Sequence, residues 1–314
     1  MFVEPFGVRC SEILRARGFR VKHSDKILRQ EYDEVIAIFT KVSFVLNETF
    51  LKQFINLKFI VTPSTGTDTI KLSKEQSSMV DLITLRDDKR TLESFFSTRE
   101  VFFWLLISLL RNTHSGSKIV EGGVWDRNLH FGENVYGKTL GILGFGRIGR
   151  HIADVAKSMG MKVKAFDINP LATKNINEFQ FKSIDHFLSD LNVLSVNIDD
   201  RPSNQFFVNS HLISKLPDRG AYLINTSRGS LVDEYAIIKG LKHGQILGYG
   251  TDVLAGEGSE VNWLTKNKLW IEMNKGRYNI IITPHLGGAT KENIVKAELS
   301  VIKTFLDRYN SNGK

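Results

Sequence analysis

The spacing of apolar residues predicts an alternation of short strands and amphipathic helices along much of the chain. Near the middle, an apolar run at 140–143 precedes a stretch in which apolar side chains recur at helical spacing: Ile148, Ile152, Val155, Ala156 and Met159. Such residues share one face of a helix, and Gly160 stands where a helix commonly ends. Residues 161–167 then alternate between apolar and polar, which is typical of a strand. We therefore expect a strand, a helix and a second strand in this order.

A glycine-rich turn joins the first strand to the helix. Its glycines have the spacing Gly-x-Gly-x-x-Gly. Gly144 permits a tight turn, Gly146 lets the backbone approach a pyrophosphate, and Gly149 lets the helix pack close to the strand. Free N–H groups at the helix N-terminus can then bind the pyrophosphate. A purely structural turn is the alternative, but the context favours a dinucleotide site formed by Gly144, Phe145, Gly146, Arg147, Ile148 and Gly149.

An acidic residue ends the second strand of this unit. Asp167 lies close to the spacing of about 20 residues at which a carboxylate can bind both ribose hydroxyls of the adenosine. It would also repel the 2′-phosphate of NADP, and the following Ile168 and Asn169 offer no guanidinium to bind one. The sequence therefore predicts NAD as the cofactor.

Length and composition indicate the number of domains and the cellular setting of the protein. A chain of 314 residues suggests about two domains, and a hydrophobic content of 42% suffices for ordinary globular cores. The single cysteine, Cys10, permits no intrachain disulfide, and Glu4 and Pro5 stand where a secretory signal would be apolar. The longest apolar run, 101–110, is too short to span a bilayer and predicts a buried helix. We expect a cytoplasmic protein with no membrane partner.

The formal net charge of +8 raises the question of nucleic-acid binding. The basic residues are scattered among acidic ones rather than clustered with aromatic ones, and even Arg86, Lys89 and Arg90 are interrupted by Asp87 and Asp88. We therefore expect no nucleic-acid partner. The excess positive charge can still raise the local concentration of an anionic substrate.

The nucleotide turn lies near the middle of the chain, so another folding unit must precede it. Short β-rich runs at 35–39 and 59–62, with a helix expected over 48–55, predict a smaller α/β domain. Its second strand leads into a turn at 63–68 whose N–H groups could face a ligand. The helix around 98–110 is expected to connect the two domains.

Later strands are predicted to end beside charged side chains, with 221–225 before Arg228, 248–253 before Glu257 and 280–284 before His285. In a doubly wound sheet the carboxyl ends of the strands line the ligand crevice. We therefore expect these three side chains and Asp252 to converge beside the nicotinamide.

Such a set suits the reduction of a 2-oxo acid or its reverse. Arg228 can hold a carboxylate with two parallel hydrogen bonds, and His285 can give a proton to the developing alkoxide. Glu257 would orient the imidazole and stabilise its charged form. Each residue also has an ordinary explanation: a surface ion pair for Arg228, a turn residue for His285 and a solvated acid for Glu257. Their order after a nucleotide turn favours the catalytic interpretation.

Taken together, the motifs resemble the D-isomer-specific 2-hydroxyacid dehydrogenase family over nearly the whole chain. The similar segments are Trp125 followed by Gly137–Gly149, the arginine motif Ile224–Gly229, the glutamate motif Asp252, Val253 and Glu257, and the histidine motif Pro284–Gly288. The resemblance implies an α/β fold in which a Rossmann-type, doubly wound parallel sheet domain of residues 96–288 is inserted into a smaller flavodoxin-like substrate domain. That smaller domain would comprise residues 1–95 and 289–314, so that the C-terminal helix returns to it.

The resemblance also implies roles for individual residues. It assigns Arg228 to substrate binding and catalysis, and Glu257 with His285 to acid–base chemistry. Asp252 would lie near the nicotinamide amide, and the other implied cofactor contacts include Ile168, Thr226, Ser227 and Gly287. The backbone of Ser64, Thr65 and Gly66 would bind the substrate carboxylate. The family expectation is a homodimer with NAD and no metal.

Several positions depart from the family pattern. Gly258 replaces a proline after the glutamate, which should loosen that loop, and the run 197–200 replaces a stretch of histidine, apolar residue, proline and leucine over the cofactor. Glu257 argues against the formate-oxidising branch. Because few residues follow His285, we expect no regulatory domain of the kind that some phosphoglycerate dehydrogenases append.

Two kinds of function fit these observations. The first is an NAD-dependent oxidoreductase acting on a small 2-hydroxy or 2-oxo acid of the hydroxypyruvate, glyoxylate or phosphoglycerate class. The second is a catalytically idle NAD(H)-binding protein of the same fold, such as a corepressor or assembly factor. Because all three catalytic positions are filled, we favour the enzyme.

Overall fold

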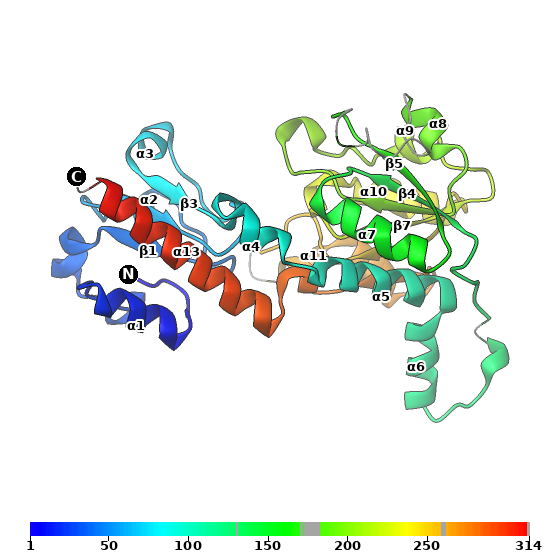
Figure 1. Cartoon of the computed structure of the whole chain (residues 1–314). Helices are drawn as coiled ribbons and strands as arrows, with labels where there is room; N and C mark the ends of the chain where they lie inside the picture. Colours follow the sequence, from blue (N-terminus) through cyan, green and yellow to red (C-terminus); the bar gives the residue numbers. More distant parts are fainter. Residues whose placement is uncertain (130, 170–171, 173–182, 259–261, 313–314) are drawn as a thin grey trace. The chain divides into compact units, whose positions relative to one another are not determined.

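The computed structural model describes residues 1–129, 131–169, 172, 183–258 and 262–312 (Figure 1). The chain divides into two compact units. One unit joins Met1–Phe95 with Ala289–Lys314, and the other is Phe96–Gly288.

The smaller unit is built on a parallel sheet with the order β1-β2-β3, whose strands are β1 (Ala37–Phe39), β2 (Phe59–Val61) and β3 (Asp81–Ile83). Phe2 forms a further parallel bridge to Phe39 at the β1 edge. The long helix α13 (Lys291–Asn312) lies along this unit, and its buried Val301 and Phe305 join the same hydrophobic cluster as Phe39 and Phe59. The C-terminal segment therefore belongs to the core of the smaller unit.

Short helices complete the smaller unit: α1 (Val8–Ala16), α2 (Glu48–Leu51), α3 (Lys74–Met79) and α4 (Lys89–Glu93). The helix expected over 48–55 begins as expected, because the Asn47 side chain accepts a hydrogen bond from the Phe50 N–H at 2.9 Å. It ends earlier, at Leu51. The following residues form tight turns that bring Phe54 into the core, where only 4% of it is exposed.

The larger unit contains a parallel sheet with the order β5-β4-β6-β7-β8-β9. Its strands are β4 (Thr139–Leu143), β5 (Lys162–Phe166), β6 (Val193–Val196), β7 (Ala221–Asn225), β8 (Ile246–Thr251) and β9 (Ile280–Ile282). Because β4 lies between β5 and β6, the strand order reverses there, which is the topological switch point of a doubly wound sheet. The predicted Rossmann-type sheet is therefore confirmed.

The larger unit also contains the helices α5 (Ser97–Arg111), α6 (Thr113–Glu121), α7 (Arg147–Ser158), α8 (Ile184–Leu188), α9 (Ser210–Ile213), α10 (Glu234–Lys242), α11 (Trp263–Lys266) and α12 (Lys268–Asn274). Two hydrophobic clusters fill the unit. One joins α5 and α7 to the strands, with Leu105 and Ile152 fully buried, and the other contains Phe187 of α8 and Ile237 of α10.

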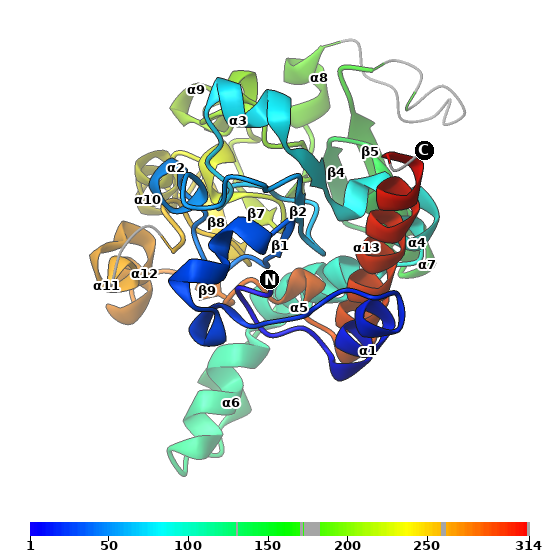
Figure 2. The same ribbon diagram turned by 90° about the vertical axis from the view of Figure 1, so that its left-hand side faces the viewer.

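Two helices of the larger unit differ sharply in their surroundings. Helix α5 contains the apolar run 101–110 and packs in the core. Helix α6, which follows it, has no buried residue and extends away from the sheet in both views (Figures 1 and 2). None of the described helices combines the length and apolarity needed to cross a membrane.

Candidate active site

The glycine-rich turn follows β4 at the switch point, and its local geometry requires glycine. Gly144 has a positive φ of 93°, and a Cβ there would lie 2.7 Å from the backbone carbonyl of Asn197. A Cβ on Gly149 would lie 2.4 Å from the Gly144 oxygen, whereas Gly146, which caps α7, faces open space. These positions match the turn, helix-packing and pyrophosphate-approach roles expected for the three glycines.

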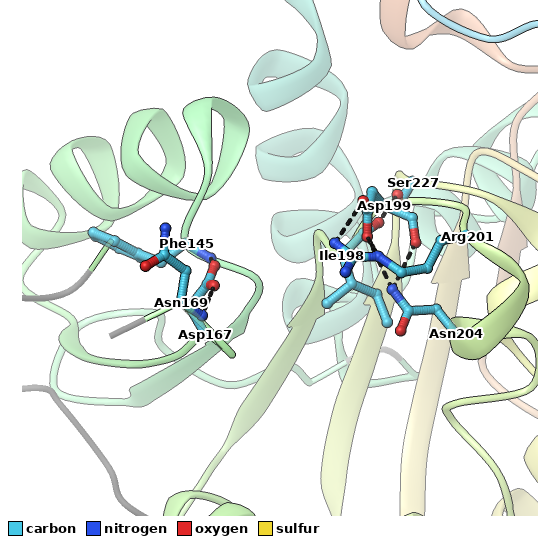
Figure 3. A network of polar contacts seen from close by, with 8 residues as sticks. All are labelled: Phe145, Asp167, Asn169, Ile198, Asp199, Arg201, Asn204 and Ser227. Carbon is cyan, nitrogen blue, oxygen red and sulfur yellow. Dashed lines mark hydrogen bonds and ion pairs between the residues drawn. The ribbon is translucent and has the colours of Figure 1, made fainter. Parts of the chain in front are cut away.

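Asp167 lies directly against this turn. Its carboxylate accepts hydrogen bonds from the Phe145 N–H at 2.7 Å and the Asn169 N–H at 2.8 Å (Figure 3). Each carboxylate oxygen can accept a further bond, so the group keeps capacity for ribose hydroxyls. The neighbouring Ile168 is 69% exposed at the same rim. Asp167 thus orders the turn that it borders and remains a candidate for ribose binding.

Unpaired polar atoms mark the carboxyl ends of the next two strands. The Thr226 hydroxyl after β7 and the Asn197 side-chain oxygen after β6 are buried, and neither has a hydrogen-bond partner within the described part of the chain. The Ser227 hydroxyl, by contrast, donates to the Ile198 carbonyl at 2.6 Å. Orphaned polar atoms after strands on the same sheet edge as the glycine-rich turn fit a bound dinucleotide, which would supply the missing partners.

The structure brings together the two residues expected to form the acid–base pair. The Nδ1 atom of His285 lies 2.8 Å from the Oε1 atom of Glu257, and the two side chains are 38% and 40% exposed. With Nδ1 occupied, Nε2 is the ring atom that remains for proton transfer. Gly256 and Gly258 flank the glutamate with φ values of 74° and 70°. A proline at position 258 could not adopt this conformation, so the loop follows a path specific to glycine.

The turn that carries His285 is held by a buried carboxylate. His285 has a positive φ of 55°, which is uncommon for a residue with a side chain. Asp252 is 1% exposed and accepts hydrogen bonds from the Thr283 hydroxyl at 2.5 Å and from the Leu286 and Gly287 N–H groups at 2.7 Å. Asp252 therefore anchors this turn. Its implied contact with the nicotinamide amide stays a prediction.

Two hydroxyls at the start of α5 hold the same turn, and the motifs of the sequence did not predict this role. The carbonyl of Gly287 accepts from the Ser97 hydroxyl at 2.5 Å and from the Thr98 hydroxyl at 3.0 Å. Adjacent serine and threonine residues at the beginning of a predicted helix were the available signal, but they are equally common as ordinary helix caps.

Arg228 follows β7 on the same edge of the sheet. Its side chain is half-buried and donates to the Ser227 carbonyl at 2.8 Å, while its own carbonyl accepts from Asn225 at 2.9 Å. A Cβ on Gly229 would lie 2.1 Å from the backbone of Leu254. Close packing at Gly229 thus brings the arginine loop against the chain segment that leads to Glu257.

The turn expected to bind the substrate carboxylate lies in the smaller unit, after β2. Ser64, Thr65 and Gly66 are half-buried. The Gly66 N–H donates to the Ser64 hydroxyl at 3.1 Å, and the Ser64 carbonyl accepts from Leu85 at 3.0 Å. One of the three expected donors therefore has a partner inside the turn. No group of three or more potential metal ligands occurs among the described residues.

The fold and the turn at the switch point define a dinucleotide-binding protein of the Rossmann type. A family model described as "D-isomer specific 2-hydroxyacid dehydrogenase, NAD binding domain" matches residues 103–287. The chain therefore belongs to the D-isomer-specific 2-hydroxyacid dehydrogenase family, as its motifs predicted.

Individual relatives agree with this family. D-3-phosphoglycerate dehydrogenase of Haemophilus influenzae is 34% identical over 218 residues, which cover 69% of this chain and 51% of the relative. The chain thus corresponds to about half the length of that relative. Glycerate dehydrogenase of Methylorubrum extorquens is 30% identical over 275 residues, covering 85% of this chain and 80% of the relative.

Solved structures show the same fold. D-lactate dehydrogenase from Aquifex aeolicus, complexed with NAD and lactic acid, matches with a TM-score of 0.78 at 23% identity and covers 99% of this chain and 95% of that one. A glyoxylate reductase from Paecilomyes thermophila matches with a TM-score of 0.77 at 23% identity, covering 96% and 92%.

Proposed function

We propose that this protein is an NAD-dependent oxidoreductase that transfers a hydride between the nicotinamide and a small D-2-hydroxy or 2-oxo acid. The observation that carries the proposal is the 2.8 Å contact between His285 and Glu257. This pair lies on the same sheet edge as the glycine-rich turn, because both follow the carboxyl ends of parallel strands. The relatives' names favour substrates of the hydroxypyruvate, glyoxylate or 3-phosphoglycerate class.

The side chains divide the chemistry among them. Arg228 holds the substrate carboxylate through its planar guanidinium and polarises the adjacent carbonyl. NADH, when bound, supplies the hydride. His285 gives the proton from Nε2 to the oxygen of the former carbonyl, and Glu257 stabilises the protonated ring from Nδ1. Because His285 is partly exposed, it can regain its proton from solvent.

Hydrogen bonds around the turn hold His285 in place before the substrate binds. The Asp252 carboxylate holds the turn by accepting hydrogen bonds from the N–H groups of Leu286 and Gly287. The imidazole therefore does not need to be ordered during the reaction. We assign NAD binding to residues 96–288, including Thr226 and Ser227, and binding of the substrate carboxylate to the turn at 64–66 in the smaller domain.

A panel assay tests the proposal. The protein is mixed with NADH and a series of 2-oxo acids, and the fall in NADH absorbance is followed. We expect turnover of at least one acid, at a rate that falls by about a hundredfold or more in a His285→Ala variant. Binding of NADH with no turnover of any acid would support the idle regulatory protein instead. A protein that binds no NADH would contradict both alternatives.

We propose further that the protein forms a homodimer through the region around α6. Large aromatic side chains of this region are strongly exposed: Trp104 at 45%, Trp125 at 90% and Phe131 at 76%. Exposed apolar groups of this size are typical of protein interfaces, and a second copy of the chain is the partner always present. Light scattering coupled to gel filtration tests this, and a monomer at micromolar concentration would contradict it.

We also propose a cytoplasmic location. Its support is the single cysteine, Cys10, which is buried and forms no disulfide. Fractionation of cells that express the protein tests this proposal.

A further inference from the structure

The segment 197–204 borders the nucleotide turn on the side opposite Asp167. It begins directly after β6, while Asp167 directly follows β5, and these two strands are the neighbours of β4. The segment also touches the turn, because a Cβ on Gly144 would lie 2.7 Å from the Ile198 nitrogen. Figure 3 shows this segment and Asp167 as two polar clusters beside the ends of the strands. Side chains of the segment therefore flank the region where Asp167 would bind ribose.

An ion pair with two parallel hydrogen bonds dominates this segment. The guanidinium of Arg201 donates from Nε to Asp199 Oδ1 at 2.8 Å and from Nη2 to Asp199 Oδ2 at 2.7 Å. Asn204 braces the acid by donating to its Oδ1 and to its carbonyl, both at 2.9 Å. The two charged side chains are 47% and 57% exposed, so solvent and ligands can reach them. The Nε and Nη2 atoms of Arg201 thus each donate to Asp199 in this structure.

The charge of Asp167 also acts on this arginine. The hydrogen bond and charge of Asp199 raise the pKa of Arg201, and the charge of Asp167 contributes in the same direction. The guanidinium therefore lies within electrostatic reach of the carboxylate expected to bind the adenosine ribose. Arg201 is also the kind of group that a 2′-phosphate would need, since guanidinium and phosphate form strong paired hydrogen bonds.

We infer that Asp199 is a second determinant of cofactor choice, because it holds Arg201 in an ion pair and withholds the guanidinium from the 2′-phosphate of NADPH. This inference rests on the proposed NAD-dependent function. Asp167 disfavours the 2′-phosphate by electrostatic repulsion. Asp199 disfavours it by holding in an ion pair the Arg201 guanidinium, which could otherwise bind the phosphate. Release of Arg201 should therefore improve NADPH binding while Asp167 is still present.

The test measures cofactor binding rather than turnover, by titrating the intact protein with NADH and with NADPH and following fluorescence. Asp199→Asn removes the charge and keeps the size of the side chain. We expect the Kd for NADPH to fall by about tenfold, which corresponds to about 1.4 kcal/mol, with little change in the Kd for NADH. In the double variant Asp199→Asn/Arg201→Gln this gain should vanish, because the phosphate ligand is gone.

A neighbouring acid provides the matched control. Asp200 carries the same charge but accepts from the Ser230 hydroxyl at 2.7 Å. Asp200→Asn should change the Kd for NADPH by no more than about twofold, because solvent screens an exposed charge that holds no phosphate ligand. An equal gain in Asp200→Asn, a gain that survives loss of Arg201, or no gain in Asp199→Asn would each overturn the inference. Failure of the unaltered protein to bind NADH would instead overturn the proposed function and this inference with it.

Discussion

His285 and Glu257 meet through a 2.8 Å contact between Nδ1 and Oε1, although they belong to loops that follow different strands. The contact depends on the parallel pairing of β8 with β9, which places the ends of these strands side by side. It also fixes the ring so that Nε2 is the atom available for proton transfer.

Replacement of His285 by alanine should lower turnover in the reductive direction by about a hundredfold to ten-thousandfold, the usual contribution of general acid–base catalysis. NADH binding should persist, because the glycine-rich turn and Asp167 are expected to carry it. Steady-state kinetics and a fluorescence titration measure the two effects separately. A variant that retained nearly full turnover would show that another group donates the proton.

Glu257→Gln should lower kcat for reduction. The substitution keeps a hydrogen-bonding group of the same size but removes the carboxylate whose Oε1 atom lies 2.8 Å from His285 Nδ1. Hydrogen bonds to a charged group are roughly twice as strong as neutral ones, so the imidazole is held less firmly in the variant. The measurement requires conditions in which chemistry limits the rate. An unchanged kcat under those conditions would mean that Glu257 does not act on His285.

Arg228→Lys should reduce kcat/KM without a comparable loss of stability. A lysine keeps the positive charge but cannot reproduce the planar pair of hydrogen bonds, so the expected cost is about 1.5 to 3 kcal/mol of transition-state binding. Thermal unfolding of the variant is the control, and its midpoint should stay close to that of the unaltered protein. Undiminished efficiency on the best substrate would exclude Arg228 as the carboxylate ligand.

NADH should be preferred over NADPH by at least about tenfold in Kd, or about 1.4 kcal/mol. Asp167→Ala should erode this preference, because it removes both the repulsion of the 2′-phosphate and the ribose hydrogen bonds. It should also weaken NADH binding, since the Phe145 N–H loses the acceptor that lies 2.7 Å away. Equal affinity of the unaltered protein for the two cofactors would refute the assignment of Asp167.

Cys10 should be unreactive in the folded protein. Burial, with a contribution from the nearby Glu298 carboxylate, raises the pKa of the Cys10 thiol to about 12. The nucleophilic thiolate is therefore scarce at neutral pH. Iodoacetamide treatment followed by mass spectrometry should show alkylation only in denaturant, which serves as the control. Rapid labelling of the native protein would contradict the buried environment.

Local requirements of the backbone explain why part of the site was predictable. Gly144 and Gly149 were predicted at a tight turn and a close helix contact. The positive φ of Gly144, and the 2.4 Å that would separate a Cβ on Gly149 from the Gly144 oxygen, both require the absence of a side chain. Such requirements restrict residue types within a short window, so they are visible in a sequence. The apolar periodicity of the following helix is visible for the same reason.

The hydrogen-bond partners of polar side chains could not be predicted in this way. The carboxylate of Asp252 anchors the turn at 283–287, which is distant in the sequence, and this role was not expected. The hydroxyls of Ser97 and Thr98 were not expected to hold Gly287 at all. The type of a polar residue determines whether its side chain can donate or accept a hydrogen bond. It does not determine which of many segments supplies the partner.

By itself, the sequence determined the strand–turn–helix unit, because periodicity and glycine spacing express constraints that act between near neighbours. The family and its parallel Rossmann-type sheet followed from the resemblance of several motifs along the chain. Only the tertiary structure decided that Asp199 takes the guanidinium of Arg201 and that Asp252 holds the histidine turn. These choices depend on which strand ends become adjacent when the sheet forms. The physical reason is that hydrogen bonds between distant segments are selected by three-dimensional proximity, which residue types alone do not specify.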